Sequence, residues 1–379
     1  MTQSFSYWEK TSFLSGFDVI IIGSGIVGLS AALNLKIKTP SLNIGILEAG
    51  FLPSGASTKN AGFACFGSLS EAINDIKSSS ESTFLQLVEM RWTGLSRLRK
   101  HLGDQAISFN CYGGYEIFKE KEESIAQEYI EQIEYLNTLL KPIIGKPDIY
   151  AVSNAKIADF GLSGINNLIK NKYEGQIDSG KMMKVLISKV QGMGVQIFNN
   201  CRVRQIEQAS LGHHLYSDQG NFKTKAVVLA TNAFARELVP ELEVLPGRGQ
   251  VLVTEPIKNL KIRGTFHYNK GYTYFRNIDN RILLGGFRDL DPVGEQTTEP
   301  GITDHIQTAL EEFLYETILP HQKIKIEYRW SGVMGFGSEL KPIVKEIRPN
   351  LYCAVRCNGM GIALGSVIGE QVAELVQPF

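Results

Sequence analysis

The chain has 379 residues, which at roughly 150 residues per domain predicts two or three domains. Its 39 Lys and Arg residues are balanced by 39 Asp and Glu residues. This zero net charge argues against nucleic acid or an anionic membrane as the main partner, because both need a basic surface. Hydrophobic residues make up 43% of the chain and charged residues 21%, which is typical of a globular protein with a sizeable core.

The numbers of glycines and cysteines say more about the kind of globular protein this is. Glycine accounts for 37 of the 379 residues, or 37/379 = 9.8%, whereas it makes up about 7% of an average protein. Such an excess without low complexity indicates many places where the backbone turns sharply or approaches something closely. The five cysteines are scattered and none forms a Cys-x-x-Cys pair. They predict free thiols in a reducing compartment, and argue against a disulfide framework or a zinc site.

Targeting and membrane signals are weak. The first 17 residues carry no basic segment ahead of an apolar stretch. The longest apolar run, Val19–Leu35, is interrupted by glycines and is too short to span a bilayer. The sequence therefore predicts a cytoplasmic protein that does not enter a membrane.

The first predicted elements form a β-turn-α-β segment. Asp18–Ile22 is a short apolar strand that runs into a glycine turn, a helix follows over Ile26–Lys38, and a second strand covers Asn43–Leu47. This segment has the length of one βαβ unit, which predicts a parallel sheet. Further along the chain, Ser80–Leu102 and Ser124–Leu140 are predicted to be helices.

The middle of the chain begins with an amphipathic helix over Lys181–Met193. Short predicted strands follow it, at Val195–Phe198, Cys201–Glu207, His214–Ser217 and Lys225–Leu229. The last of these is a continuous apolar run, which is typical of a buried parallel strand.

From about Leu245 to Trp330 the pattern changes. The predicted strands there are Gln250–Thr254, Tyr272–Arg276, Arg281–Leu284 and Lys325–Trp330, with one helix over Thr303–Ile318. This alternation predicts a mainly antiparallel sheet in a different layer from the N-terminal segment. The chain ends with a strand at Leu351–Ala354 and a helix at Ile362–Val376. We expect these two to rejoin the N-terminal parallel sheet.

The most specific motif is the glycine turn Gly23-Ser24-Gly25-Ile26-Val27-Gly28 between the first strand and helix. The first glycine permits the tight turn, the second lets the backbone approach a pyrophosphate, and the third lets the helix pack on the strand. The helix N-terminus offers free N–H groups to the phosphates. Glu48 ends the second strand, where it can accept hydrogen bonds from a ribose. A second glycine cluster, Gly359-Met360-Gly361, lies too near the C-terminus to begin another such unit, so we predict one dinucleotide site.

The glycine turn is followed along the chain by an ordered series of further motifs. The series runs through Gly55–Gly62, Asp178, Val203, Ala230-Thr231-Asn232, Pro246–Gln250, Trp330-Ser331-Gly332 and Asn358–Gly361. It resembles the D-amino-acid oxidase, glycine oxidase and sarcosine oxidase (DAO) family of FAD-dependent amine oxidoreductases. Details in Tyr272–Arg276 and in Gly285–Arg288 resemble most the branch that contains gamma-glutamylputrescine oxidase.

The resemblance implies an α/β and α+β fold, with a Rossmann-like FAD-binding domain and a discontinuous antiparallel-sheet substrate domain. The expected FAD-binding domain comprises residues 15–95, 171–235 and 340–379, and the substrate domain residues 96–170 and 236–339. FAD is expected to be non-covalent, because the segment Gly337–Ile343, which in sarcosine oxidases carries the linking cysteine, has none. The implied cofactor-binding residues are Gly23, Gly25, Ile26, Val27, Gly28, Glu48, Ala49, Ser57, Lys59, Asn60, Ala61, Gly62, Val203, Ala230, Thr231, Asn232, Gly332, Gly359, Met360, Gly361 and Ile362.

The substrate side carries less specific signals. Tyr272 and Tyr274 alternate along one strand and so share a face, Arg276 continues that face, and Arg288 follows the next strand. We weigh these residues and Arg248 as substrate contacts against cross-strand packing and surface charge. Glycine oxidases grip the substrate carboxylate with an arginine at the position that aligns with Met334 here. The substrate therefore either lacks an α-carboxylate or is held by Arg276, Arg288 or Arg248.

The implied function is oxidation of the C–N bond of a small primary or secondary amine or an amino acid to an imine, with hydride transfer to flavin N5. O2, giving H2O2, or another acceptor would reoxidise the flavin. The alternatives are a tRNA-modifying FAD oxidase domain, against which the zero net charge argues, and a flavin-binding protein without turnover. No histidine has a partner at metal-ligand spacing, so no metal is predicted. The sequence assigns no catalytic base and no oligomeric state.

Overall fold

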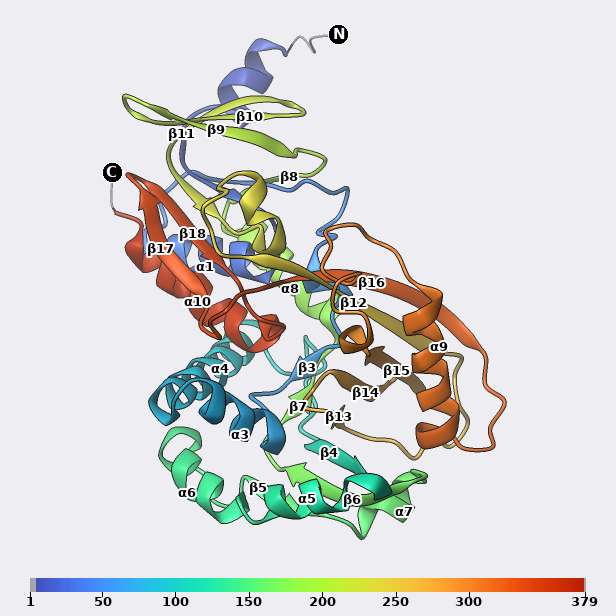
Figure 1. Ribbon diagram of the computed structural model, residues 1–379. Coiled ribbons are helices and arrows are strands. Elements are labelled where there is room, and N and C mark those ends of the chain that lie inside the picture. The colour runs from blue at the N-terminus through green and yellow to red at the C-terminus, as the bar shows by residue number, and fades with distance from the viewer. Residues whose placement is uncertain (1–4, 378–379) are drawn as a thin grey trace. The chain divides into compact units, whose positions relative to one another are not determined.

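The structure is a computed structural model that describes residues 5–377 (Figure 1), and its chain divides into two compact units. Unit 1 comprises Met1–Thr58, Gly180–Pro246 and Met334–Phe379, and unit 2 comprises Lys59–Ser179 and Gly247–Val333. Both units are discontinuous in sequence. The two units divide the chain at other places than the expected domains: residues 59–95 and 171–179 fall in unit 2, and residues 236–246 and 334–339 fall in unit 1.

A hydrophobic cluster explains why residues 59–95 fall in unit 2. Phe84 and Val88 of α4 (Glu81–Leu102) are buried together with Leu136 and Leu140 of α6 (Ile133–Ile144). Ile169 of β6 (Ile165–Asn171), a strand of the unit 2 sheet, belongs to the same cluster. Burying these apolar side chains against α6 and β6 ties α4 to unit 2.

Unit 1 is built on a mostly parallel sheet. Its strands in spatial order are β17 (Ile343–Arg348), β18 (Leu351–Val355), β11 (Gly220–Leu229), β1 (Phe17–Ile22), β2 (Ile44–Leu47) and β8 (Gln196–Phe198). All neighbours pair in parallel except β17 and β18. A hairpin of β9 (Val203–Ala209) and β10 (Gly212–Ser217) extends β11 in antiparallel pairing. The predicted return of the C-terminal strand to this sheet is confirmed by the pairing of β18 with β11.

The apolar strands of unit 1 are buried on both faces, as in other parallel sheets that helices cover. Ile20 and Ile21 of β1 point to opposite faces and are both fully buried. The helices of this unit are α1 (Ile26–Lys38), α8 (Ser179–Gly192) and α10 (Gly361–Leu375), with short helices at Glu9–Phe13 and Asn232–Glu237.

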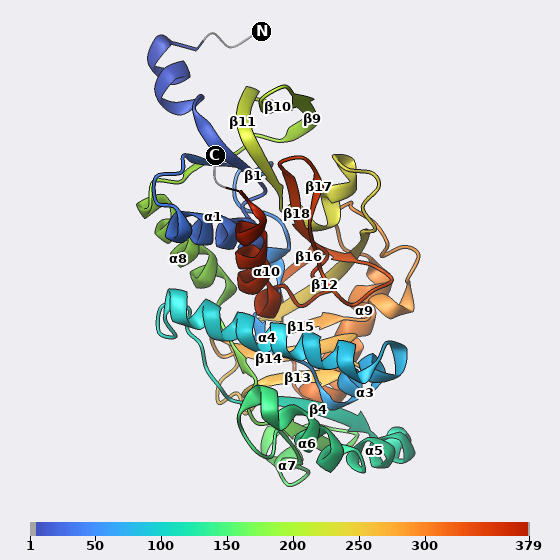
Figure 2. The same cartoon turned by 90° about the vertical axis from the view of Figure 1, so that its left-hand side faces the viewer.

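Helices α1 and α10 lie side by side in unit 1 (Figure 2). Glycines on α10 permit this close approach: a Cβ on Gly369 would lie 2.5 Å from Cβ of Ser30, and one on Gly365 would lie 2.7 Å from the Ile26 side chain. Larger residues at either glycine would push α10 away from α1. The C-terminal helix is therefore fitted to the helix that follows the glycine turn.

Unit 2 contains a second large sheet, which is mainly antiparallel as predicted. Its strands in spatial order are β16 (Ile326–Phe336), β12 (Leu245–Thr254), β15 (Arg281–Gly286), β14 (Thr273–Ile278), β13 (Thr265–Tyr268), β4 (Gly114–Lys119), β6 and β5 (Tyr150–Val152). The pairing of β13 with β4 is parallel. A small second sheet pairs β3 (Phe63–Ala64) with β7 (Gly175–Gln176).

One cluster of the unit 2 core packs α9 (Asp304–Phe313) against the large sheet. Phe266 and Phe275 are fully buried and stack at 4.5 Å between ring centroids, and Phe313 of α9 packs beside Phe275. The remaining helices of this unit are α2 (Ala56–Lys59, which begins in unit 1), α3 (Leu69–Ser78), α5 (Glu123–Ile130) and α7 (Lys156–Phe160), with short helices at Glu120–Glu122, Arg288–Leu290 and Leu314–Ile318.

Several elements differ from their predicted extents. The predicted helix Ser124–Leu140 is two helices, α5 and α6, interrupted around residues 131–132. Strands β4, β6, β13 and β17 and helix α3 have no counterpart among the predicted elements. Within residues 5–377, no helix combines the length and the apolar character needed to cross a bilayer. All five cysteines are free thiols, and four of them are buried.

Candidate functional site

The predicted dinucleotide motif lies at one edge of the unit 1 sheet. Because β1, β2 and β11 pair in parallel, their carboxyl ends meet at the same edge. Gly23 follows β1, Glu48 follows β2 and Ala230 follows β11. In open α/β sheets, ligands bind outside the carboxyl ends of the strands, so the fold gathers these residues where a ligand is expected.

The glycine turn depends on the absence of side chains at two positions. Gly23 has φ +102°, and a Cβ there would lie 2.9 Å from the carbonyl oxygen of Ala230. A Cβ on Gly28 would lie 2.0 Å from the carbonyl oxygen of Gly23. Both neighbours are backbone atoms that cannot move aside without distorting the strands. The turn thus has the close packing that the fingerprint predicts.

Glu48 supports this turn directly. The carboxylate accepts hydrogen bonds from the backbone N–H of Ser24 at 3.0 Å and from its hydroxyl at 2.6 Å. Its second oxygen accepts from the N–H of Gly50 at 2.9 Å, and the residue is 8% exposed. Each carboxylate oxygen has further lone-pair capacity, so contact with a ribose remains compatible with these bonds and stays a prediction.

Two hydroxyl groups lie beside the glycine turn. The Ser57 hydroxyl accepts a hydrogen bond from the N–H of Ile26, the first residue of α1, at 2.9 Å. The Thr231 hydroxyl, which follows β11, is buried and has no hydrogen-bond partner among the described residues. A buried orphan hydroxyl costs free energy unless a ligand satisfies it. Together with the side-chain-free glycine turn, it fits a bound dinucleotide.

The turn before α10 is also held in place by side-chain hydrogen bonds. The side-chain oxygen of Asn232 accepts from the N–H groups of Arg356 at 3.1 Å and Cys357 at 3.4 Å. Gly359 has φ +79°, a conformation that favours glycine, and α10 then begins at Gly361 with no acidic residue in its first turn. The helix N-terminus therefore keeps its partial positive charge, as needed for the predicted contact with the flavin.

The other predicted cofactor residues of unit 1 lie along the same chain segments. Ala49 follows Glu48, Val203 is buried at the start of β9, and Met360 and Ile362 flank the first residue of α10. The structure carries no FAD contact for them, and their roles stay predictions.

The predicted cofactor loop continues in unit 2 from Lys59. The side-chain oxygen of Asn60 accepts from the N–H of Gly62 at 2.8 Å and from the hydroxyl of Ser179 at 2.6 Å. The indole N–H of Trp330 donates to the carbonyl of Lys59 at 2.9 Å. A Cβ on Gly332 would lie 3.0 Å from Cβ of Lys59. These contacts bring Lys59–Gly62 and Trp330–Gly332, two motifs far apart in sequence, together within unit 2. Ala61 and Trp330 both pack against one small hydrophobic cluster of that unit.

Two of the predicted substrate contacts have partners in the interior of unit 2. Arg276 is 3% exposed, and one terminal nitrogen of its guanidinium donates to the carbonyls of Gly62 at 2.8 Å and Ile177 at 2.7 Å. Arg248 is 8% exposed and pairs through two nitrogens with the carboxylate of Glu295, at 2.9 Å each. Both guanidinium groups therefore support the fold of unit 2, and their contact with a substrate stays a prediction.

The other predicted substrate residues make two contacts in unit 2, Tyr274 with Phe63 and Arg288 with Tyr272, and we call these four residues the aromatic cluster. The Tyr274 ring lies 5.6 Å from that of Phe63, edge to face, and packs over Gly285, where a Cβ would meet it at 2.7 Å. The Arg288 guanidinium lies 5.0 Å from the centre of the Tyr272 ring, and that ring is 38% exposed. Burial raises the pKa of Tyr274 to about 12, so its hydroxyl stays neutral at physiological pH. The cluster offers aromatic walls with one cation at its edge.

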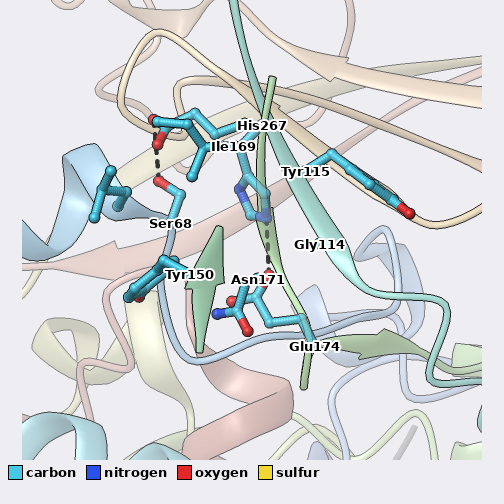
Figure 3. A pocket seen from close by; sticks show the side chains of 10 residues that line it. Ser68, Gly114, Tyr115, Tyr150, Ile169, Asn171, Glu174 and His267 are labelled. Atoms are coloured by element: carbon cyan, nitrogen blue, oxygen red, sulfur yellow. Dashed lines mark hydrogen bonds and ion pairs between the residues drawn. The ribbon is translucent and has the colours of Figure 1, made fainter. Parts of the chain in front are cut away.

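A second group in unit 2 was not anticipated from the sequence. His267 on β13 pairs across the strands with Tyr274 on one side and Glu116 on the other. Its ring points toward the carboxylate of Glu174, with 3.5 Å between Nε2 and the nearer oxygen (Figure 3). His267, Glu116 and Glu174 are 5%, 3% and 0% exposed. Cys65 completes the group: its Sγ and one ligand atom each from Glu174 and His267 lie within 4.8 Å of one another.

The charges of this group shift its pKa values strongly. Burial by itself lowers the pKa of His267, but Glu174, then Glu71 and Glu116, raise it to about 9. Burial raises the pKa of Glu116 to about 7 despite hydrogen bonds from Ser70. Perturbed ionisable groups gathered in one place are candidates for function. Sequence reading missed them because Cys65, Glu174 and His267 are about a hundred residues apart and share no local motif.

Comparison with known proteins supports the cofactor site. A family model described as FAD dependent oxidoreductase (DAO) matches residues 18–375. The chain is 25% identical to the probable oxidoreductase OrdL of Haemophilus influenzae, covering 95% of this chain and 82% of that protein. It is also 25% identical to gamma-glutamylputrescine oxidoreductase of Escherichia coli, covering 95% and 83%.

A solved structure shows the same fold. The crystal structure of glycine oxidase from Geobacillus kaustophilus superposes with a TM-score of 0.77 at 21% identity, covering 95% of this chain and 94% of that one. The Rossmann-like sheet with its glycine turn, the antiparallel second sheet and the match over nearly the whole length agree with one another. The chain belongs to the DAO family of FAD-dependent oxidoreductases.

Proposed function

We propose that this enzyme oxidises the C–N bond of a small amine or amino acid to an imine. Two relatives support the substrate class: one is named gamma-glutamylputrescine oxidoreductase, and the solved neighbour is a glycine oxidase. In the reaction, a hydride equivalent leaves the carbon next to nitrogen while the nitrogen lone pair forms the C=N bond. Water then hydrolyses the imine to a carbonyl compound and an amine or ammonia. O2, giving H2O2, or another acceptor takes the electrons in the second half-reaction.

The residues of unit 1 would hold the cofactor. The N-terminus of α1 with Gly23, Gly25 and Gly28 would take the pyrophosphate, and Glu48 the ribose. When bound, FAD supplies the two-electron acceptor that no side chain of this protein can provide. The buried orphan hydroxyl of Thr231 is the observation on the cofactor side that favours a resident ligand.

The aromatic cluster of unit 2 would prepare the amine. Only a neutral amine has a lone pair to stabilise the developing iminium, whereas an alkylamine in water is mostly protonated at neutral pH. The rings of Phe63 and Tyr274 exclude water, and poor solvation lowers the pKa of an amine placed against them. Tyr274 remains an uncharged phenol, so it does not counteract this effect by stabilising an ammonium.

Arg288 would anchor the substrate, and its position is the observation that carries the proposal. The Arg288 guanidinium lies 5.0 Å from the centre of the Tyr272 ring, which is 38% exposed, and its charge acts on the hydroxyl of Tyr274. A carboxylate or another anionic group of the substrate would bind this cation, and the amine would then extend toward Tyr274.

Dye reduction and peroxide release by the FAD-loaded enzyme test the proposal. The substrate panel contains sarcosine, glycine, D-amino acids and acylated polyamines, each with its decarboxylated counterpart where one exists. We expect turnover of at least one amine. A flavin-loaded protein that is inactive on the whole panel, with both the dye and O2 as acceptors, would contradict the proposed substrate class.

An arginine variant tests the anchor separately. Arg288→Met should lower kcat/KM for the anionic substrate by about 10- to 100-fold, the effect of losing one charged hydrogen bond. Activity toward a substrate without the anionic group should stay the same. The matched control, Arg263→Met, removes an exposed arginine elsewhere in unit 2 and should change neither value. Equal losses for both substrates would reject Arg288 as the anchor.

A further inference from the structure

We propose that Cys65, Glu174 and His267 form a zinc site inside unit 2, beside the Phe63 ring that the proposed function places against the amine. The three donors come from three segments: Cys65 follows β3, Glu174 lies between β6 and β7, and His267 is on β13. Thiolate, imidazole and carboxylate are the protein ligands of Zn²⁺, and three of them leave one position of a tetrahedral ion for water or a small ligand.

The spacing of the donors fits a shared ion better than a direct contact. Nε2 of His267 and Oε2 of Glu174 are 3.5 Å apart. A direct charge-assisted hydrogen bond spans about 2.7–2.9 Å. Two ligands of one tetrahedral zinc stand roughly 3.3 Å apart when each is about 2.0–2.1 Å from the metal. The Sγ of Cys65 lies within 4.8 Å of one ring nitrogen of His267 and of one carboxylate oxygen of Glu174.

Two of the donor atoms are also orphaned. Among the described residues, Nε2 of His267 and Oε2 of Glu174 are buried without a hydrogen-bond partner. Both residues are more than nine-tenths buried and point toward one another (Figure 3). Buried polar atoms without partners are rare in native proteins, and a bound ion is one of the recognised explanations.

The surroundings orient the donors as zinc sites require. The carboxylate of Glu71 lies 3.8 Å from Nδ1 of His267, on the side of the ring away from Glu174. The order of these groups is that of the carboxylate–histidine–metal arrangement around zinc ligands, at a distance longer than a hydrogen bond. Glu174 accepts hydrogen bonds at its other oxygen from the N–H groups of Phe66 at 3.1 Å and Gly67 at 3.0 Å. These bonds leave Oε2 directed at the site.

The local charge also calls for a cation. Three carboxylates, of Glu71, Glu116 and Glu174, act on His267. Arg91, whose charge acts on Cys65, lies 3.6 Å from the carboxylate of Asp75. A divalent ion would offset this negative charge in an interior where unbalanced charge is costly. On binding, the thiol of Cys65 and the protonated ring of His267 each release one proton to solvent as their bonds to zinc form, and no electron is transferred. The competing occupant is a proton on His267, held by Glu174.

Metal analysis of the intact, FAD-loaded protein tests the proposal. The protein is purified after growth with zinc, washed with a chelator and separated by gel filtration, and its zinc is measured by mass spectrometry. We expect one zinc per chain in the wild type and near-complete loss in Cys65→Ser and His267→Gln. The matched controls Cys111→Ser, an exposed cysteine, and His214→Gln, in unit 1, should keep the metal.

Two further measurements test whether zinc is bound at this site, even if a variant of a buried ligand fails to fold. X-ray absorption at the zinc edge of the wild type should show one sulfur at about 2.3 Å and lighter N/O ligands. Glu71→Gln, which keeps all three donors, should weaken zinc binding by about 10- to 100-fold. A wild type that holds no zinc, or zinc without a sulfur neighbour, would overturn the proposal. Neither readout depends on turnover, so failure of the proposed amine oxidation would leave it intact.

Discussion

Two buried histidines, one in each unit, show how differently the units handle polar groups. His213 on β10 of unit 1 is 2% exposed and His267 on β13 of unit 2 is 5% exposed. Burial lowers the pKa of His213, whereas the carboxylates around His267 raise its pKa to about 9 despite burial. The same side chain at the same depth thus prefers opposite charge states. Its neighbours decide this, and around His267 they come from remote segments.

The same contrast holds for the groups linked to function. In unit 1, Glu48 and Ser24 are brought together by one βαβ segment, and the bond between them spans 24 positions in sequence. In unit 2, Glu174 and His267 are brought together by separate strands and loops. Local motifs build the first group, and long-range pairing builds the second. We therefore expect substitutions in the local motifs of unit 1 to impair flavin binding. Substitutions in the long-range contacts of unit 2 should instead lower the free energy of unfolding.

The largest expected effect is in the local group. Gly28→Val places a Cβ 2.0 Å from the carbonyl oxygen of Gly23 and forces the turn apart. We expect the purified variant to show no flavin absorption band after FAD addition and gel filtration, because the phosphate cradle is lost.

The matched control for this change is Gly55→Ala. Gly55 lies in the neighbouring motif, but a Cβ there meets no atom within 4 Å and its φ is ordinary for any residue. This variant should keep its flavin. Retention of FAD by Gly28→Val with unchanged circular dichroism would mean that the glycine turn does not carry the cofactor.

The next largest effect concerns the long-range support of unit 2. Arg276→Met removes two buried hydrogen bonds from a guanidinium to the carbonyls of Gly62 and Ile177. The free energy of unfolding should fall by about 2–4 kcal/mol, measured by urea denaturation. Arg288→Met, a change of the same chemistry near the surface, should cost less than about 0.5 kcal/mol. Similar losses for the two variants would contradict the structural role given to Arg276.

A smaller effect is expected at Glu48. Glu48→Gln keeps the size of the side chain but presents an amide where the N–H and hydroxyl of Ser24 need acceptors. FAD binding should weaken by about 1–2 kcal/mol, or roughly 5- to 30-fold in Kd by flavin fluorescence titration. Glu241→Gln, on the surface of the same unit, provides the control. An unchanged Kd would show that Glu48 contributes neither to the turn nor to the ribose contact.

The sequence was most informative where structure is local. Strand β1, helix α1 and the glycine turn between them lie within a residue or two of their predicted places because apolar runs and glycine spacing specify them. The predicted antiparallel sheet is present as well. Strands β4 and β13 were missed, since Gly114–Lys119 and Thr265–Tyr268 carry charged or histidine side chains at positions that proved to be buried.

Those missed strands contribute to the unanticipated site. Glu116 and His267 look like surface residues in the sequence, and only the parallel pairing of β4 with β13 places them side by side inside unit 2. Arg276 and Arg248 show the converse case, because their charge suggested a ligand and the structure gives them partners in backbone carbonyls and in Glu295. A single sequence shows residue type and spacing, but not which distant partner satisfies a charge.

The smallest expected effect is the contribution of His213 to the pH dependence of stability. Burial lowers its pKa in the folded state below that of an unfolded histidine, about 6.5. Below that value the unfolded chain binds a proton that the folded chain does not, so stability falls as pH decreases. Between pH 7.5 and 5.5 the wild type should lose up to about 1.4 kcal/mol more than His213→Gln. The urea midpoints of both proteins measure this difference, and His214→Gln, on the opposite side of β10, should behave as the wild type does. If removing His213 leaves the pH dependence unchanged, burial alone is not what distinguishes the two histidines.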